Sequence, residues 1–332
     1  MITREIQQER EYQVLSSFAC KAKESKGRAM DEEQCTIRTD FQRDRDRIIH
    51  SKSFRRLMHK TQVFLAPEGD HYRTRLTHTI EVSQIARTIA RGLGMNEDLT
   101  EAIAMGHDLG HTPFGHSGEA VLNEIHEGGF KHNVQSLRVV DLLESRTDRR
   151  GMNLTYEVRD GIVNHTGSVT PCTVEGQIVK TSDRIAYINH DIDDAIRSGI
   201  ISLEDLPKEA IGILGTTHKL RIDTLVRDMI ENSWEKPYAA LTEEKAGAMN
   251  ELRTYMFKNV YNNNEVKKVE DLHKVQTVIE SLYTYFTEHL TELPTEYYQM
   301  TSEFGGTDIV KDYIAGMTDR YALTTYEKIF EK

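Results

Sequence analysis

Apolar residues recur at helical spacing along most of this chain, whereas the alternation typical of strands is scarce. One pattern has an apolar residue every four to five positions and stops at Gly94; its members are Leu76, Ile80, Ile85, Ile89 and Leu93. A stripe of this kind followed by a glycine is typical of an amphipathic helix and its C-terminal end. Because the 332 residues include only six prolines, long helices meet few interruptions. The sequence therefore predicts an all-α fold.

Further helices are expected around this one. Asn96 is a typical N-cap for a helix that carries Leu99 and Ile103 and runs into the sequence His107-Asp108-Leu109-Gly110. Other segments with a helical pattern are Leu137–Glu144, Val179–Ile196, Leu220–Ile230 and Val269–His289. Residues 166–172 are predicted to form a loop, and a short hairpin within 151–174 remains an alternative.

The length of the chain is sufficient to bury a real hydrophobic core. We find no internal repeat, low-complexity tract or flexible linker that would divide it. We therefore expect one helical domain over residues 1–332. It would consist of a catalytic core at about 37–199 and a C-terminal helical portion at about 200–332 packed against that core.

The composition argues against several classes of protein. No run of 18 apolar residues occurs, and the charged N-terminus lacks the apolar centre of a signal peptide, so no membrane association is expected. Three scattered cysteines form no pairable framework, which favours a cytoplasmic location. A formal net charge of −11 argues against a general nucleic-acid binder. The basic strip 43–56 has two interpretations, a local contact with a polyanion or a solvated helix face laced with ion pairs.

Histidines are concentrated in one part of the chain, since nine of the 14 lie between His50 and His132. Histidine is the commonest metal ligand and a common acid–base residue, so this concentration indicates a site. His78, the pair His107-Asp108, and Asp183 offer two imidazoles and two carboxylates, a donor set that suits a divalent ion. Neighbours on a regular helix point about 100° apart, so His107 and Asp108 can both turn inward only at a helix end. Each residue taken alone also has a structural interpretation, but together they predict a divalent metal site.

The pattern formed by His78, His107-Asp108 and Asp183 resembles the H…HD…D signature of the HD phosphohydrolase superfamily. Four surrounding segments are similar to its dGTP triphosphohydrolase branch: DRDRIIHSKSFRRLMHKTQVF (44–64), GDHYRTRLTHTIEVSQIAR (69–87), GHDLGHTPFGHSGE (106–119) and TSDRIAYINHDIDDA (181–195). The resemblance is strong over about 37–199 and looser beyond. It implies metal-dependent hydrolysis of deoxynucleoside triphosphates, dGTP above all, to deoxynucleoside and inorganic triphosphate. Mixed His and Asp ligation leaves Mn, Mg, Fe, Ni and Zn open as the ion.

Four further residues surround the expected metal. His116 and Glu119 are three apart and share a face on a helical turn, where a carboxylate raises the basicity of an imidazole and fixes its tautomer. An incidental pair near a helix N-terminus is the alternative. The resemblance implies that His116 is the acid for the leaving 5′-oxygen, with Glu119 as its partner. It also implies that His111 and His132 approach the α-phosphate.

The contacts to the phosphate chain are implied by the same resemblance. A triphosphate brings about four negative charges and requires cationic side chains. Arg75 lies one helical turn before His78 and matches an arginine that contacts the phosphates; a surface ion pair is its alternative interpretation. Arg253 and Tyr261 also match substrate-binding positions, and Phe257 stands where some relatives have a histidine.

The contacts to the sugar are expected along one helix face, because Asp183, Tyr187 and Asp191 follow one another at intervals of four residues. The resemblance implies that Tyr187 packs against the 2′ carbon and excludes a ribose hydroxyl. It further implies that Asp191, together with Gln62, holds the 3′-hydroxyl. A tyrosine that only packs in the core is the alternative for Tyr187.

The resemblance also implies a symmetric homo-oligomer, a tetramer or hexamer, and leaves a dNTP allosteric effector open. Two other functions remain as alternatives. One is another HD-type nucleotide phosphohydrolase, such as a 5′-nucleotidase or a phosphodiesterase, which needs the metal ligands but not Gln62, Tyr187 or the pair His116 and Glu119. The other is a regulatory nucleotide-binding module that has lost catalysis, against which the intact ligand set argues.

Overall fold

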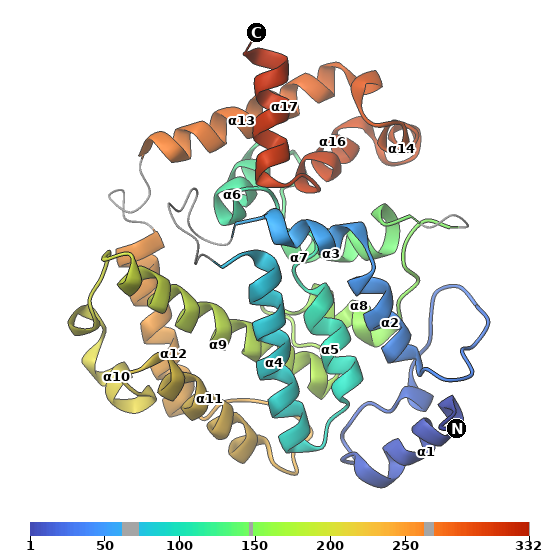
Figure 1. Ribbon diagram of the computed structural model, residues 1–332, viewed down its shortest axis with the longest axis vertical. Coiled ribbons are helices and arrows are strands. Elements are labelled where there is room, and N and C mark those ends of the chain that lie inside the picture. Colours follow the sequence, from blue (N-terminus) through green and yellow to red (C-terminus); the bar gives the residue numbers. More distant parts are fainter. Residues whose placement is uncertain (62–72, 146–148, 262–268, 332) are drawn as a thin grey trace.

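The computed structural model describes residues 1–61, 73–145, 149–261 and 269–331. Within these ranges the chain forms helices and three isolated β-bridges but no sheet, which confirms the predicted all-α fold (Figure 1). None of the helices in these ranges has both the length and the apolar character needed to cross a bilayer.

Three helices pack together at the centre of the molecule (Figure 1). They are α4 (Arg75–Leu93), α5 (Glu97–Gly106) and α9 (Val174–Arg197). Each contributes fully buried aliphatic side chains, among them Ile89, Ile103 and Ile185, to one continuous hydrophobic cluster. Burial of such side chains is the main force that holds these helices together.

The ends of α4 and α5 follow the signals in the sequence. Gly94 ends α4 with a φ of 66°, the left-handed conformation that glycine adopts without steric cost. The side-chain oxygen of Asn96 accepts hydrogen bonds from the backbone N–H groups of Asp98 and Leu99, at 3.1 and 3.2 Å. The predicted helix stop and the predicted N-cap are both confirmed.

Other predicted segments have different bounds. Helix α9 begins at Val174 rather than Val179, because the hydroxyl of Thr173 caps it by accepting from the N–H of Gly176 at 3.0 Å. The segment predicted over 137–144 belongs to α7 (His132–Arg138) and the π-helical turn η3 (Val139–Leu143). Residues 166–172 form the predicted loop. The alternative of a short hairpin within 151–174 is wrong, because this segment contains the helix α8 (Tyr156–Val163) and no strand.

The remaining helices surround this centre. The first part of the chain adds α1 (Arg4–Val14), η1 (Ala22–Glu24), α2 (Asp40–Ile49), α3 (Lys52–Arg56), η2 (Leu57–His59) and α6 (Gly115–Ile125). Beside α4 and α9 lie η4 (Leu203–Asp205), α10 (Lys208–Leu214), α11 (His218–Ser233), α12 (Glu243–Met256) and η5 (Phe257–Tyr261). The last group is α13 (Val269–Glu288), η6 (Leu290–Glu292), α14 (Thr295–Tyr298), α15 (Thr301–Phe304), α16 (Gly306–Ala315) and α17 (Asp319–Phe330).

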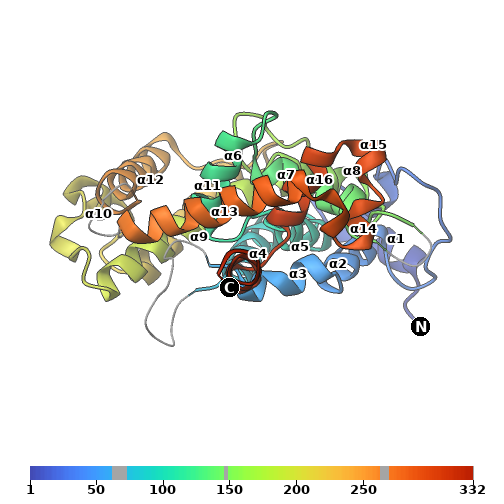
Figure 2. The same ribbon diagram turned by 90° about the horizontal axis from the view of Figure 1, so that it is seen from above.

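The last group of helices packs on α6, and α13 runs across the molecule when seen from above (Figure 2). Leu122 of α6, Ile279 of α13 and Ile314 of α16 are fully buried in a second hydrophobic cluster. Leu143 packs against both clusters and so lies between them. The organisation into one domain with a core at 37–199 and a C-terminal portion at 200–332 stays a prediction.

The first arginines of the basic strip 43–56 are engaged in ion pairs. Arg43 pairs with Glu32 at 3.0 Å, and Arg47 pairs with the same carboxylate. Arg45 lies 3.2 Å from Glu101 on α5. Arg45 therefore ties α2 to α5, while Arg43 and Arg47 hold the segment that precedes α2, in agreement with the ion-pair interpretation of the strip.

The turn that follows α5 lies directly on the first turns of α7. A Cβ atom at Gly110 would lie 2.1 Å from the backbone nitrogen of Ser136 and 2.6 Å from the carbonyl oxygen of His132. The hydroxyl of Ser136 donates to the carbonyl of His107 at 2.7 Å and accepts from the N–H of Gly110 at 2.9 Å. The backbone of the turn is thus held against α7 with no room for a side chain.

Replacement of Gly110 by alanine should lower the free energy of unfolding by about 2–3 kcal/mol, because the obstructing atoms belong to the backbone and cannot rotate away. Gly212→Ala is the matched control, since its Cβ meets open space inside α10 and should raise stability by about 0.5–1 kcal/mol. Urea denaturation followed by circular dichroism measures both values. Equal stabilities of the two variants would contradict the close approach at Gly110.

Candidate functional site

Two imidazoles and two carboxylates converge where α4, the end of α5, and α9 meet. Nε2 of His78 lies 3.1 Å from Oδ1 of Asp183 and 3.9 Å from Oδ2 of Asp108. Nε2 of His107 lies 3.5 Å from Oδ1 of Asp108 and 3.8 Å from Oδ1 of Asp183. The structure therefore brings together the four residues predicted as metal ligands.

The donor atoms of this cluster fit a divalent cation. Nδ1 of His107 donates to the carbonyl of Ala104 at 2.7 Å, so the free lone pair is on Nε2, which faces the cluster. That Nε2 is buried and has no hydrogen-bond partner among the described residues. A buried acceptor without a partner is costly, and coordination of a cation removes this cost. His78, His107 and Asp108 offer ligand atoms within 4.8 Å of one another.

Both carboxylates of the cluster are held in the ionised form. Burial acts to raise the pKa of Asp108, but the neighbouring imidazoles of His107 and His111 and the charge of Arg75 outweigh it and hold this pKa well below its usual range. At Asp183 the hydrogen bond with His78 and the neighbouring imidazole of His107 likewise outweigh burial, and the pKa falls to about 2. Two anionic oxygens beside two imidazoles are suitable ligands for a divalent metal.

Next to this cluster lies a second group of imidazoles around one carboxylate. Oε1 of Glu119 accepts from the backbone N–H of His132 and lies 2.9 Å from Nδ1 of the same residue. Oε2 of Glu119 lies 3.3 Å from Nδ1 of His116. The ring of His111 stacks on that of His132 with centroids 4.2 Å apart, and its Nε2 is 3.4 Å from Oδ1 of Asp108. The structure thus brings all four predicted catalytic residues together beside the predicted metal ligands.

Glu119 affects its two imidazole partners differently. Burial lowers the pKa of His132, but the hydrogen bond and charge of Glu119 outweigh it, so this pKa is raised. At His116, desolvation lowers the pKa and outweighs the hydrogen bond to Glu119. Water still reaches one side of the ring, since 66% of the His116 side chain is exposed. The hydrogen bond to Glu119 therefore raises the pKa of His116, as expected, but the pKa as a whole is lowered.

Sequence reasoning missed His165, which lies in the same group. Its Nδ1 donates to the carbonyl of Ile162 at 2.7 Å, and its Nε2 lies 3.3 Å from Nε2 of His132. The side chain is buried, and this burial lowers its pKa to about 3, so the ring is neutral at physiological pH. No local pattern marks this residue, because its partners come from α7 and α8 and meet only in the folded chain.

Both groups open on a cavity of about 580 Å³. Its wall includes the predicted site residues Arg75, His78, Asp108, His111, His116, His132, Asp183, Tyr187, Asp191 and Arg253. Another part of the wall is largely apolar, with Val121 from α6, Phe257 from η5, and Leu272 and Val275 from α13. Apart from Phe257, sequence reasoning missed these residues, because an apolar helix face that lines a cavity has the same pattern as one that packs in a core.

Arg75 lines the part of this cavity that the predicted metal ligands form. Its side chain is buried, and Nη1 donates to Oδ2 of Asp108 at 2.9 Å. The alternative of a surface ion pair is therefore wrong, because the ion pair is buried and its partner is a predicted metal ligand. The guanidinium is placed where it can meet an anionic group that reaches the cluster.

Tyr187 and Arg253 lie together farther along the cavity. The hydroxyl of Tyr187 accepts a hydrogen bond from Nε of Arg253 at 2.9 Å, and the guanidinium of Arg253 lies over the ring of Phe257, 5.0 Å from its centroid. Asp191 is buried one turn after Tyr187 on α9 and also lines the cavity. Tyr187 is therefore a wall residue with a polar partner, not only a packing residue.

Two predicted substrate contacts cannot be placed in this way. Gln62 lies outside the described residues, and Tyr261 ends η5 with its side chain outside the described part. Their predicted roles therefore stay predictions.

Comparison with known proteins agrees with this geometry. The HD domain family matches residues 75–188, and the phosphohydrolase-associated domain family matches residues 239–328. A deoxyguanosinetriphosphate triphosphohydrolase-like protein of Caldanaerobacter subterraneus subsp. tengcongensis is 59% identical over 330 residues, which cover 99% of this chain and 96% of the relative. Proteins of the same name from Desulfatibacillum aliphaticivorans and Clostridium tetani are 47% and 48% identical. They cover 99% and 93% of this chain, and 98% and 91% of their own lengths. This chain therefore belongs to the HD-domain phosphohydrolase family of deoxyguanosinetriphosphate triphosphohydrolase-like proteins.

Proposed function

We propose that this protein is a metal-dependent triphosphohydrolase that converts deoxynucleoside triphosphates, dGTP above all, to deoxynucleoside and inorganic triphosphate. One observation carries the proposal: the cluster of predicted metal ligands and the imidazoles around Glu119 open on the same cavity, and part of its wall is apolar. Such a cavity suits a ligand with an anionic end and a flat apolar end, as a nucleotide has. The names of the relatives point to the same class of substrate.

His78, His107, Asp108 and Asp183 would hold Mn, Mg, Fe, Ni or Zn, since mixed nitrogen and oxygen ligation does not select sharply among these ions. When bound, the ion supplies a Lewis acid that activates water and offsets phosphate charge. Arg75 and His111 lie beside Asp108 and meet the same charge from the protein side.

The proposed reaction breaks the bond between the α-phosphorus and the 5′-oxygen. Water provides the new oxygen on phosphorus, and the sugar leaves as an alkoxide that needs a proton. His116 is suited to donate this proton, because its Nδ1 faces Glu119 and its other ring nitrogen is available to the cavity. His132, whose pKa Glu119 raises, adds positive charge on the side of the α-phosphate.

The sugar is proposed to lie against α9. There the ring of Tyr187 excludes a 2′-hydroxyl, because an added hydroxyl would meet a filled wall and lack a partner. Asp191 and Gln62 are proposed to hold the 3′-hydroxyl. The hydrogen bond from Arg253 fixes the direction of the Tyr187 ring.

Assembly into a tetramer or hexamer, activation by a dNTP effector and a cytoplasmic location all stay predictions from the family resemblance and the composition. Another HD-type phosphohydrolase and a regulatory module remain the alternative functions. The first would release orthophosphate or open a diester, and the second would release nothing.

The wild-type protein should release inorganic triphosphate from dGTP only when a divalent metal is supplied. His107→Ala and Asp183→Ala should abolish both this release and the bound metal, because each removes a ligand while leaving the hydrophobic clusters intact. Elemental analysis and circular dichroism measure metal content and fold. His126→Ala is the control, since that buried histidine hydrogen-bonds to Tyr283 away from the site. Full metal content in His107→Ala would mean that the ligand assignment is wrong.

Tyr187→Ala should raise the rate with GTP relative to the rate with dGTP, because it opens the wall beside the 2′ carbon. Tyr187→Phe is the matched control: it removes the hydroxyl that accepts from Arg253 but keeps the ring, so the discrimination should persist. Separate kcat/KM values for dGTP and GTP give the ratio. If Tyr187→Ala retains the wild-type ratio, this tyrosine does not select the sugar.

The activity should decrease as the pH rises through the pKa of His116, because a general acid must be protonated. The pH profile of kcat/KM reports the free protein, in which this pKa lies below its ordinary value. The profile of kcat reports the complex, in which the bound triphosphate adds about four negative charges and raises the pKa. The kcat/KM profile should therefore decline at a lower pH than the kcat profile. Glu119→Gln should move the basic limb to lower pH, since it removes a charge that favours the imidazolium.

His116→Ala should lower kcat with little change in KM, and a substrate with a 5′-thio linkage should restore its rate selectively, because a thiolate leaves without protonation. Equal impairment on both substrates would make His116 a phosphate-binding residue and leave His111 or His132 as the acid.

A further inference from the structure

One carboxylate near the C-terminus joins two backbone segments that border the proposed active site. Oδ1 of Asp319, in the first turn of α17, accepts from the N–H of Phe114 at 2.9 Å. Its Oδ2 accepts from the N–H and the hydroxyl of Thr61, at 3.0 and 2.7 Å. Phe114 lies between His111 and His116 in the chain, so Asp319 holds the loop that follows His111 and leads into α6, whose second residue is His116.

Lys60 makes a second connection between the same segments. Its buried Nζ donates to the carbonyl of His111 and, at 2.8 Å, to the carbonyl of Ala315 at the end of α16. The carbonyl of Lys60 accepts from the N–H of Arg75 at 3.1 Å, and Thr61 forms a β-bridge with Thr74. The start of α4 is thereby tied to the same point.

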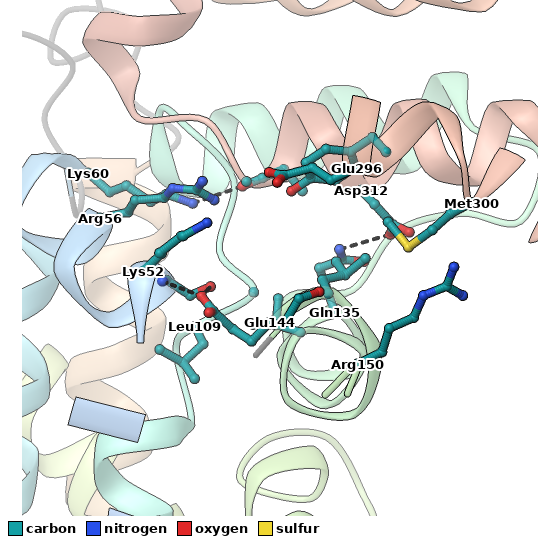
Figure 3. Close-up of a pocket in the computed structure, with 18 of the residues that line it drawn as sticks. Lys52, Arg56, Lys60, Leu109, Gln135, Glu144, Arg150, Glu296, Met300 and Asp312 are labelled. Atoms are coloured by element: carbon teal, nitrogen blue, oxygen red, sulfur yellow. Dashed lines mark hydrogen bonds between the residues drawn. The ribbon is translucent and has the colours of Figure 1, made fainter. Parts of the chain in front are cut away.

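The surroundings of Lys60 explain how the C-terminal helices reach this point. Figure 3 shows Lys60 beside Arg56 on the wall of a separate cavity, with Asp312 of α16 on the opposite side. Beside Asp312, the side-chain amide of Gln135 on α7 donates a hydrogen bond to its carboxylate at 2.9 Å. The C-terminal helices therefore contact the site through fixed hydrogen bonds as well as through apolar packing.

The loop that Asp319 holds has a backbone that needs such support. Phe114 has a φ of 63°, in the left-handed region that a bulky side chain rarely adopts, and Gly115 follows with a φ of 56°. The hydroxyl of Thr112 donates to the carbonyl of Gly115 at 2.9 Å. A strained conformation persists only where its surroundings hold it, and the N–H of the strained residue is the group that Asp319 accepts from.

We propose that Asp319 is a positioning residue for the reaction: together with Lys60, Thr61 and Phe114 it forms a bracket that sets His111 and His116 relative to the start of α4. The inference rests on the proposed function. Asp319 is not among the residues that line the active-site cavity, so it acts through the backbone and not on the substrate. It belongs to the part of the chain that matches the phosphohydrolase-associated domain, which gives that part a direct role in the geometry of the HD site.

The test compares Asp319→Ala and Asp319→Asn with Asp308→Ala and Asp308→Asn. Asp308 is a suitable control because it occupies the first turn of α16 and pairs with Lys311 and with His126 at the C-terminal end of α6, not with the loop. At a temperature where every variant is folded, Asp319→Ala should lower kcat on dGTP by roughly 10- to 100-fold, as expected when a catalytic group is displaced by about 1 Å. Asp319→Asn keeps one acceptor oxygen and should lose less. The Asp308 variants should retain the wild-type kcat.

Hydrogen–deuterium exchange of the segment 109–118 provides a readout that does not depend on the substrate. Asp319→Ala should accelerate exchange there, while exchange in α9 stays as in the wild type. Unchanged exchange in 109–118, or a loss of kcat that the Asp308 variants share, would overturn the proposal. If Asp319→Ala does not fold, Thr61→Val can be measured for kcat and exchange in its place, because it removes only the hydroxyl that donates to Asp319. A wild-type protein that releases no triphosphate from any dNTP would refute the proposed function, and the exchange result would still decide the bracket.

Discussion

The contact between the backbone of Gly110 and that of α7 is the constraint on which the site depends. It holds the turn that carries His107 and Asp108, and Ser136 reinforces it from both sides. Helix α7 begins at His132, whose carbonyl oxygen takes part in the same contact. The same backbone contact therefore positions both the predicted metal ligands His107 and Asp108 and the imidazole of His132 beside Glu119. Their separation is fixed by backbone atoms, which do not change rotamer.

Three of the imidazoles beside the predicted metal ligands, His111, His116 and His132, are not equivalent. Glu119 engages the ring and the backbone of His132, so that residue is held in place and its charged form is favoured. His116 is exposed and held by a single longer contact. His111 is buried, and this burial together with the charge of Arg75 lowers its pKa well below the usual value. Unequal contact with Glu119 and unequal burial thus shift the pKa values of neighbouring imidazoles in different directions, as a division of acid–base roles requires.

Features encoded within a few residues could be predicted from the sequence. Gly94 and Asn96 mark helix ends because the groups they satisfy lie within one turn. The metal ligands were predicted from the joint pattern of His78, His107-Asp108 and Asp183 and from its resemblance to the HD signature, since each residue alone has a structural interpretation. The start of α9 was placed too late, because the cap Thr173 follows a segment with loop character. His165 and Asp319 could not be found: the hydrogen bond between Asp319 and Phe114 spans 205 residues, and nothing near either residue specifies the partner.

The hydrogen bond between Arg253 and Tyr187 joins parts of the chain that match two different domain families. Bond cleavage is proposed to depend on ligands in the HD part, whereas the orientation of the tyrosine depends on a guanidinium from α12. Mutation can therefore alter the part of the cavity that is proposed to face the sugar while every predicted metal ligand is retained. Under the proposed function, this separation would let the nucleotide preference of a lineage change without loss of bond cleavage.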